Sequence, residues 1–255
     1  MKRMLLVVVG ILLLTGCGAP SDTPEHEKAA PESESLLDAI GQATAIAWVG
    51  PHRDDEIVVT GFLALCTFVY KKRTYVVPFS TGATSFPPGA TIEDRYKDNM
   101  DFKIFLQLAG YEPLGLNEYT HKKQMLFELL DEFIGKTGVD LIVTFENTHG
   151  GNGHPDHITG SQWLTEYCNP RGITLYYFIN RDPLFGGEVD PLPYTDEIDL
   201  DSIVVDTGTG MRSLWEVKVK VLEIYSSSVP TAANIVQTPE KLEAMIHTEY
   251  YRKVY

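Results

Sequence analysis

The sequence is poor in cysteine and in positive charge, and both shortages exclude classes of protein. Three cysteines among 255 residues are too few for a disulfide-stapled fold or for a zinc cluster made of cysteine alone. Pairing of Cys66 with Cys168 stays open at this point. Lysine and arginine number 21 against 35 acidic residues, a formal net charge of −14. A nucleic-acid partner is therefore not expected, because such binding relies on clustered cations. Nothing in the sequence indicates a protein partner.

The sequence also lacks an apolar run long enough for a membrane helix. Lys2 and Arg3 precede an apolar stretch from Met4 to Leu14, well short of the roughly 20 residues that span a bilayer. A positive start followed by such a run is typical of a secretory signal. The run leads into Leu14-Thr15-Gly16-Cys17, which resembles the lipobox of bacterial lipoprotein signal peptides. That resemblance implies cleavage before Cys17, lipidation of Cys17, and attachment to the membrane in the bacterial cell envelope, outside the cytoplasm. The alternative is an ordinary secretory signal in which the cysteine is incidental.

Three regions follow from this interpretation. Residues 1–16 are predicted to be the signal peptide, residues 17–35 the lipidated cysteine with a flexible tether, and residues 36–255 the functional domain. Residues 18–35 are rich in Pro, Ser, Glu and Ala and carry no large apolar side chain. Such a segment cannot bury enough surface to offset the entropy lost on ordering, so we expect it to act as a tether.

Hydrophobic residues make up 44% of the chain, enough for a sizeable core. From residue 36 onward, short apolar runs alternate with longer amphipathic segments. Strands are predicted at 44–50, 75–80, 139–145, 173–179 and 203–206. Helices are predicted at 56–70, 92–109, 121–136, 158–167, 214–225 and 239–251. This alternation implies right-handed crossovers and a mostly parallel sheet covered on both faces, hence an α/β fold of the Rossmann-like three-layer sandwich type. Ligands of such sheets bind beyond the carboxyl ends of the strands, which directs attention to the residues after 44–50 and 139–145.

Possible metal ligands follow both of those strands. The first is followed by Pro51-His52-Arg53-Asp54-Asp55-Glu56, and the second by a glycine-rich stretch and then His154-Pro155-Asp156-His157. Two histidines and a carboxylate, with His52 and Asp55 on one turn and His157 on the other, can hold a divalent metal and leave room for water. The same ligand types hold Fe(II) in oxygenases, but those enzymes are mostly rich in β-strands. A His-Pro-Asp-His turn alone is weak evidence, whereas two clusters at neighbouring strand ends form a specific pattern.

The paired motifs are similar to those of the PIG-L/LmbE-like family of zinc-dependent N-deacetylases. That family carries Ala-His-Pro-Asp-Asp-Glu after its first strand and His-Pro-Asp-His after a later one, and the resemblance covers roughly residues 44–230. This chain departs from the pattern at Arg53, where the family has proline. It also has Tyr225 and Ser228 where a late family segment has histidine and glutamine.

The resemblance implies a role for each motif residue. Zinc (Zn2+) would be held by His52, Asp55 and His157. Asp54 would be the general base that takes a proton from the attacking water, and His154 the general acid and oxyanion partner. Zinc with three protein ligands keeps a fourth position open and lowers the pKa of its water to about 7, which suits these roles.

Substrate contacts are predicted for Arg95, Arg53 and Asn147, with Asn152 as a further hydrogen-bonding residue. Arg95 lies where the family carries an arginine that contacts substrate, and Arg53 would either orient an anionic group or point to solvent. Glu56 is expected to cap the following helix or to hold a ligand histidine.

The function implied is metal-dependent hydrolysis that removes an N-acetyl group from an amino sugar or glycoconjugate, a small molecule or oligosaccharide, at the cell envelope. Two alternatives stay open. One is a catalytically silent carbohydrate-binding lipoprotein, and the other is a zinc amidohydrolase acting on a non-sugar amide. The presence of Asp54 and His154 argues against the silent protein, since neither is needed merely to hold zinc.

Overall fold

The computed structural model describes residues 34–80, 86–116, 123–187 and 192–255. The described residues belong to one compact unit. The predicted signal peptide, Cys17 and most of the predicted tether lie outside the described residues. Among the helices that the structure describes, none combines the length and the apolar character required to cross a bilayer.

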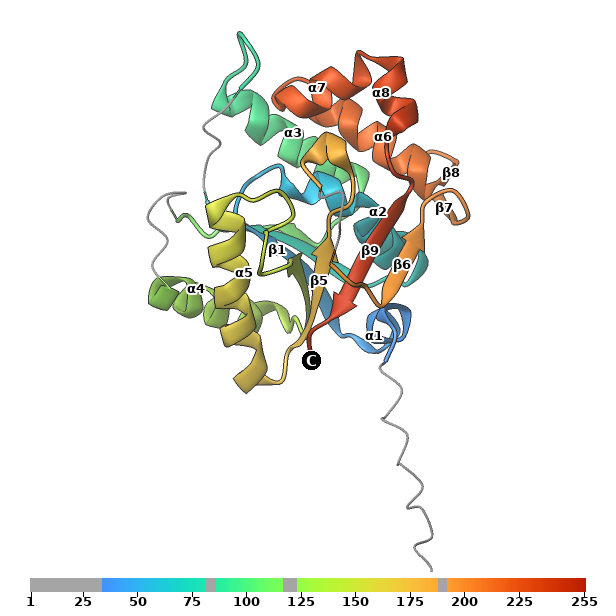
Figure 1. The fold of residues 1–255 in the computed structure, drawn as a ribbon. Helices are drawn as coiled ribbons and strands as arrows, with labels where there is room; N and C mark the ends of the chain where they lie inside the picture. The colour runs from blue at the N-terminus through green and yellow to red at the C-terminus, as the bar shows by residue number, and fades with distance from the viewer. Residues whose placement is uncertain (1–33, 81–85, 117–122, 188–191) are drawn as a thin grey trace, which may run out of the picture. The chain divides into compact units, whose positions relative to one another are not determined.

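A seven-stranded sheet forms the middle layer of this unit (Figure 1). The strand order is β3-β2-β1-β4-β5-β9-β6, and the first five strands are parallel, whereas β9 runs antiparallel to both β5 and β6. The prediction of an α/β sandwich with a mostly parallel sheet is therefore confirmed. The strands are β1 (Ala45–Gly50), β2 (Arg73–Pro78), β3 (Gly110–Tyr111), β4 (Leu141–Phe145), β5 (Thr174–Ile179), β6 (Asp196–Asp199) and β9 (Thr248–Lys253), with β7 (Val204–Asp206) and β8 (Met211–Ser213) in a separate ribbon.

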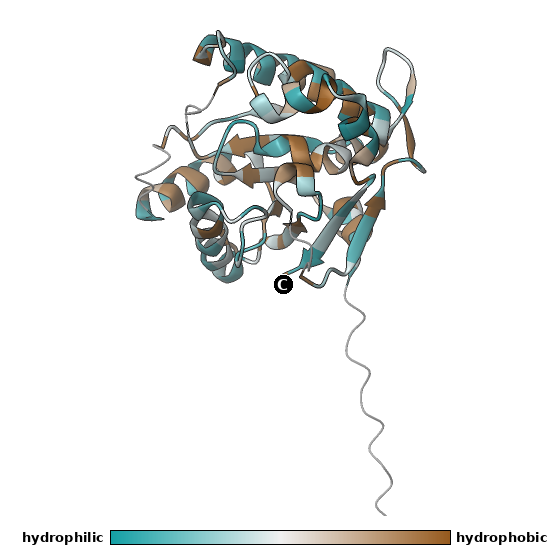
Figure 2. Cartoon of the chain, turned by 45° about the horizontal axis from the view of Figure 1, so that its top comes forward, coloured by the Kyte–Doolittle hydropathy of each residue, from teal (hydrophilic) through white to brown (hydrophobic). Residues whose placement is uncertain are grey.

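Helices cover both faces of the sheet. Every residue of β1 and β4 is therefore buried. In β1, Ala45, Ala47 and Val49 pack with the apolar sides of α4 and α5, whereas Ile46 and Trp48 pack with α1, α2 and α6. Figure 2 shows the hydrophobic strands between helices of mixed polarity. The helices are α1 (Leu36–Gln42), α2 (Thr60–Ala64), α3 (Ile92–Phe105), α4 (Lys123–Thr137), α5 (Pro155–Cys168), α6 (Leu214–Tyr225), α7 (Pro230–Val236) and α8 (Pro239–Ala244).

Two predicted helices differ from the structure. The segment predicted at 56–70 is helical but irregular: a 3₁₀ turn (η1, Asp55–Val59) precedes α2 and a π turn (η2, Leu65–Val69) follows it. The β-branched run from Ile57 to Thr60 crowds a regular α-helix, which is consistent with this break.

The prediction of one closing helix over 239–251 is wrong, because the helix ends at Ala244 and Thr248–Lys253 is strand β9. In that strand Glu249 and Tyr251 are buried and their neighbours are partly exposed, an alternation of period two that fits a sheet.

Cys66 and Cys168 are both buried free thiols. They belong to the two separate hydrophobic clusters that lie on opposite faces of the sheet, Cys66 with α2 and α6 and Cys168 with α4 and α5. The sheet between them rules out the disulfide that the sequence left open.

Candidate active site

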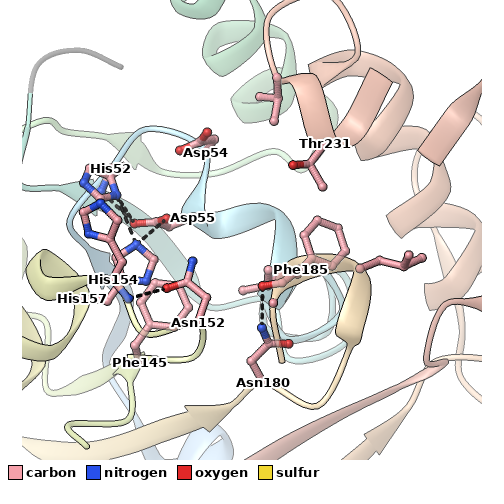
Figure 3. Close-up of a pocket in the computed structure, with 14 residues that line it drawn as sticks. His52, Asp54, Asp55, Phe145, Asn152, His154, His157, Asn180, Phe185 and Thr231 are labelled. Carbon is pink, nitrogen blue, oxygen red and sulfur yellow. Dashed lines mark hydrogen bonds and ion pairs between the residues drawn. The ribbon is translucent and has the colours of Figure 1, made fainter. Parts of the chain in front are cut away.

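The two motifs meet at the carboxyl edge of the sheet because β1 and β4 are adjacent parallel strands. His52 lies in the turn after β1, and Asp55 begins η1. His154 is the N-cap of α5, where its Nδ1 accepts a hydrogen bond from the backbone N–H of Asp156, and His157 lies one turn along that helix. Figure 3 shows the three histidines gathered beside Asp55.

The predicted metal ligands lie within a few ångströms of one another. The Nε2 atom of His157 is 3.1 Å from Nδ1 of His52 and 3.2 Å from Oδ1 of Asp55. Ligand atoms of a tetrahedral zinc site, each about 2.0–2.2 Å from the ion, lie roughly 3.3–3.5 Å apart. The spacing and the chemistry of this donor set therefore fit a zinc ion. His154 also lies near these ligands. One ring nitrogen of His52, one of His154 and one of His157 all lie within 4.8 Å of one another.

The surroundings fix how these ligands face. The Nδ1 atom of His157 lies 2.8 Å from the carbonyl oxygen of Gly150, which can only accept a hydrogen bond. Nδ1 therefore carries the ring proton, and the lone pair of Nε2 faces the other predicted ligands. The ring of Phe145 stacks on His157 at 4.2 Å. Asp55 accepts a hydrogen bond from the backbone N–H of His52 at 2.7 Å. Burial alone would raise the pKa of Asp55, but His157 and His52 hold it well below its ordinary value.

Asp54 lines the cavity and forms an ion pair with Arg95 on the side away from it. Its Oδ2 lies 3.0 Å from Nη1 of Arg95, a residue with no exposed surface. Burial raises the pKa of Asp54, and the charge of Arg95 opposes that rise. Arg95 in turn donates from Nε to the hydroxyl of Ser228 at 2.9 Å and from Nη2 to its carbonyl at 2.6 Å. Ser228 donates to Asp98, which completes a buried chain of polar groups.

Of the four residues predicted to contact substrate, only Asn152 is among the described residues that line the cavity. Arg95 does not line the cavity but lies behind Asp54. Arg53 stacks its guanidinium on Tyr96 at 4.3 Å and is also absent from the cavity wall. Asn147 accepts a hydrogen bond on its backbone oxygen from Gln162 and does not line the cavity either, whereas Asn152 does.

Glu56 has a different environment from the one predicted. Its carboxylate is fully buried and accepts hydrogen bonds from the hydroxyls of Tyr111, at 3.0 Å, and Tyr225. Glu56 lies in the first turn of η1, as expected of an acidic residue at the start of the helix, but its hydrogen bonds to tyrosines replace the expected contact with a ligand histidine. Burial raises the pKa of Glu56 to about 8. Tyr225, one of the departures from the family pattern, serves as its hydrogen-bond donor.

The cavity in front of these groups has a volume of about 500 Å³. One wall carries the titratable groups, and the rest is formed by residues that carry no recognisable motif. Asn180 was within reach of sequence reasoning, because it follows β5 directly and the carboxyl-end rule applies to that strand as well. The lining residues are His52, Asp54, Asp55, Val58, Phe145, Asn152, His154, His157, Asn180, Leu184, Phe185, Gly186, Val229 and Thr231.

Comparison with solved structures places this fold among known deacetylases. A deacetylase of the teicoplanin biosynthetic pathway (a triple mutant) matches with a TM-score of 0.57 and 16% identity, over 82% of this chain and 98% of that chain. N,N'-diacetylchitobiose deacetylase from Pyrococcus horikoshii matches with a TM-score of 0.59 and 15% identity, over 86% and 87%. GalB, a 4-carboxy-2-hydroxymuconate hydratase from Pseudomonas putida, matches with a TM-score of 0.55 and 13% identity, over 83% and 96%.

No protein-family model matches the sequence, and neither does any curated protein sequence. The likeness to solved structures at this low identity establishes a shared fold. In its fold, the resemblance to PIG-L/LmbE-type deacetylases is confirmed. Because GalB shares the fold with a different activity, the function of this chain has to be argued from the site.

The Gly150 backbone offers a test of how the site is built. Gly150 has φ +62°, and a Cβ there would lie 2.5 Å from Cβ of His157. Gly153 has φ +79°, but a Cβ there would meet no atom within 4 Å. We expect Gly153→Ala to lose about 1–2 kcal/mol through left-handed backbone strain, and Gly150→Ala to lose more because its Cβ would also lie 2.8 Å from the backbone nitrogen of Ile158. Only Gly150→Ala should also displace His157 and weaken zinc affinity by about 10–100-fold.

Urea unfolding and zinc competition with a chelator measure these two effects separately. Equal zinc affinity in the two variants would show that the Gly150 loop does not position His157.

Proposed function

We propose that this protein is a zinc-dependent N-deacetylase that acts on an N-acetylated amino sugar. The observation that carries this proposal is the convergence of His52, Asp55 and His157 with two further acid–base groups, Asp54 and His154, at one wall of a cavity. The structural neighbours described as deacetylases of the teicoplanin pathway and of N,N'-diacetylchitobiose support it. Another neighbour is described as the zinc-inhibited form of the teicoplanin deacetylase, which supports a site that is able to bind zinc.

In this proposal His52, Asp55 and His157 hold the zinc, which supplies a Lewis acid that polarises the amide carbonyl and acidifies water. Asp54 takes the proton from the attacking water, because it is the carboxylate that lines the cavity without being a ligand. His154 stabilises the developing oxyanion and delivers a proton to the leaving amine. Burial, together with the imidazoles of His157 and His52, lowers the pKa of His154. A lower pKa makes the protonated imidazole a stronger proton donor to the leaving amine.

The direct test measures zinc content and acetate release from N-acetylglucosamine and N,N'-diacetylchitobiose with the full chain. Asp54→Asn should keep its zinc and lose at least about 100-fold in turnover, the usual contribution of a general base. Asp101→Asn, which alters a carboxylate paired with Lys97 on the outer side of α3, is the matched control and should keep both.

Full turnover in Asp54→Asn would contradict the assigned role. Zinc without acetate release from either sugar would move the weight to a non-sugar amide or to the silent carbohydrate-binding protein.

Arg95 provides a second test, because its contact is with Asp54 and not with the cavity. We expect Arg95→Met to lower kcat strongly and to leave KM nearly unchanged, since the base loses the cation that holds it. Arg95→Lys, which keeps a positive charge beside Asp54, should retain more turnover. Steady-state kinetics, with urea unfolding to correct for lost stability, separates the two effects. A raised KM at unchanged kcat would show that Arg95 binds substrate after all.

We also propose that the mature protein is attached to the envelope membrane through lipid on Cys17, a residue outside the described part of the chain. The support is the lipobox-like Leu14-Thr15-Gly16-Cys17 after an apolar run. Intact-mass analysis of the protein from a bacterial host should show a chain that starts at residue 17 with an added diacylglycerol mass. A mass that corresponds to an unmodified Cys17 would contradict lipidation.

A further inference from the structure

The cavity has a second wall that the proposed chemistry leaves without a role. Leu184 and Phe185, on the 3₁₀ turn η4 (Pro183–Phe185), line it together with Val229, the N-cap residue of α7. Val58 of η1 extends the same apolar surface toward the carboxylates. In Figure 3, Phe185 lies across the cavity from the histidines, below Thr231. Leu184 and Phe185 are only partly buried, so part of their apolar surface is open to a ligand.

Hydrogen bonds from buried polar side chains hold this wall in place. The amide nitrogen of Asn180, a residue 6% exposed, donates to the carbonyl of Phe185 at 3.0 Å and to the carbonyl of Gly151 at 2.8 Å. Asp182 accepts hydrogen bonds from the backbone N–H groups of Leu184, at 3.0 Å, and Ile246, at 3.1 Å. Since Gly151 follows the glycine whose carbonyl orients His157, Asn180 links the apolar wall directly to the loop that carries the metal ligands.

The charges of the cavity limit what can bind against this wall. None of the described lining residues is a lysine or an arginine, and Asp54 and Asp55 are both carboxylates. An anionic group would therefore meet no lysine or arginine there, whereas an uncharged apolar group would displace water from Leu184, Phe185 and Val229. Removal of such surface from water is the main source of affinity in pockets of this type, and a volume of 500 Å³ lies within the range of about 300–1,000 Å³ typical of them.

We propose that Leu184, Phe185, Val229 and Val58 form a subsite for an alkyl or aryl group carried by the substrate. The preferred substrate is then a neutral, amphipathic N-acyl compound and not a small free sugar. This inference rests on the proposed function and specifies its substrate class. The apolar group has two possible sources, the aglycone attached to the sugar and the acyl chain on its nitrogen, and both present the same chemistry to the wall.

The experiment compares three substrates with the full chain: methyl and hexyl β-glycosides of N-acetylglucosamine, the latter below its micellar concentration, and the methyl β-glycoside of N-butanoylglucosamine. We expect kcat/KM for at least one of the two apolar substrates to exceed that of the methyl N-acetyl compound by at least about tenfold, the discrimination that a hydrophobic pocket gives even a single methylene. A preference for the hexyl glycoside locates the aglycone at the wall, and a preference for the butanoyl compound locates the acyl chain there.

Variants of the wall connect any preference to these residues. Phe185→Ala and Leu184→Asn should reduce the preference at least fivefold, and both side chains are exposed enough for the variants to fold. Leu114→Ala is the matched control, since Leu114 is also partly buried but lies outside the cavity, and it should keep the preference. Equal kcat/KM for all three substrates in the natural chain, or a preference unchanged in both wall variants, would overturn the subsite.

Binding to Asp54→Asn, measured by calorimetry, separates this inference from the proposed function. One outcome is that the natural chain releases acid from none of the substrates while Asp54→Asn still binds the hexyl or butanoyl compound at least tenfold more tightly than the methyl N-acetyl compound. In that case the deacetylase proposal fails and the subsite holds. If acid is released with no preference in rate or in binding, the subsite fails and the deacetylase holds.

Discussion

The parallel pairing of β1 with β4 is the constraint on which the rest of the site depends. Ile46 to Trp48 lie in register with Leu141 to Val143, so the segments that leave the two strands emerge side by side. One carries His52 and Asp55 and the other carries His157, although about a hundred residues separate them in the chain. The buried apolar side chains on both faces of these strands therefore stabilise the geometry of the polar groups at their ends.

Sequence reasoning reached the fold and the grouping of the motif residues because both depend on local patterns. Apolar runs define the buried strands, and the turn that follows a strand lies at a known edge. The position of Arg95 could not be predicted in this way, because it depends on how α3 packs against α6 and the turn that follows it, where Ser228 accepts hydrogen bonds from the guanidinium. The same limit applies to Leu184 and Phe185, which reach the cavity from a turn without a motif, and to β9, whose place in the sheet is fixed by partners on β5 and β6.

The departures from the family pattern make internal contacts and leave the predicted metal ligands intact. Arg53 stacks on Tyr96, and Tyr225 donates a hydrogen bond to Glu56. Ser228 accepts a hydrogen bond from Arg95, the arginine that follows the family pattern and pairs with Asp54. Both arginines near the first motif are thus used for internal contacts, which leaves the described cavity wall without a lysine or an arginine. The field of a chain with net charge −14 also disfavours anionic ligands, so the local and the overall electrostatics agree.

We propose that His52, Asp55 and His157 together hold one zinc ion. A crystal structure of the full chain grown with zinc, with anomalous data recorded on both sides of the zinc absorption edge, would test this assignment. It predicts a single anomalous peak at about 2.0–2.2 Å from a ring nitrogen of His52, a ring nitrogen of His157 and a carboxylate oxygen of Asp55, with His154 not bound to the ion. A peak bound by His52, His154 and His157 without Asp55, or no peak at this edge of the sheet, would contradict it.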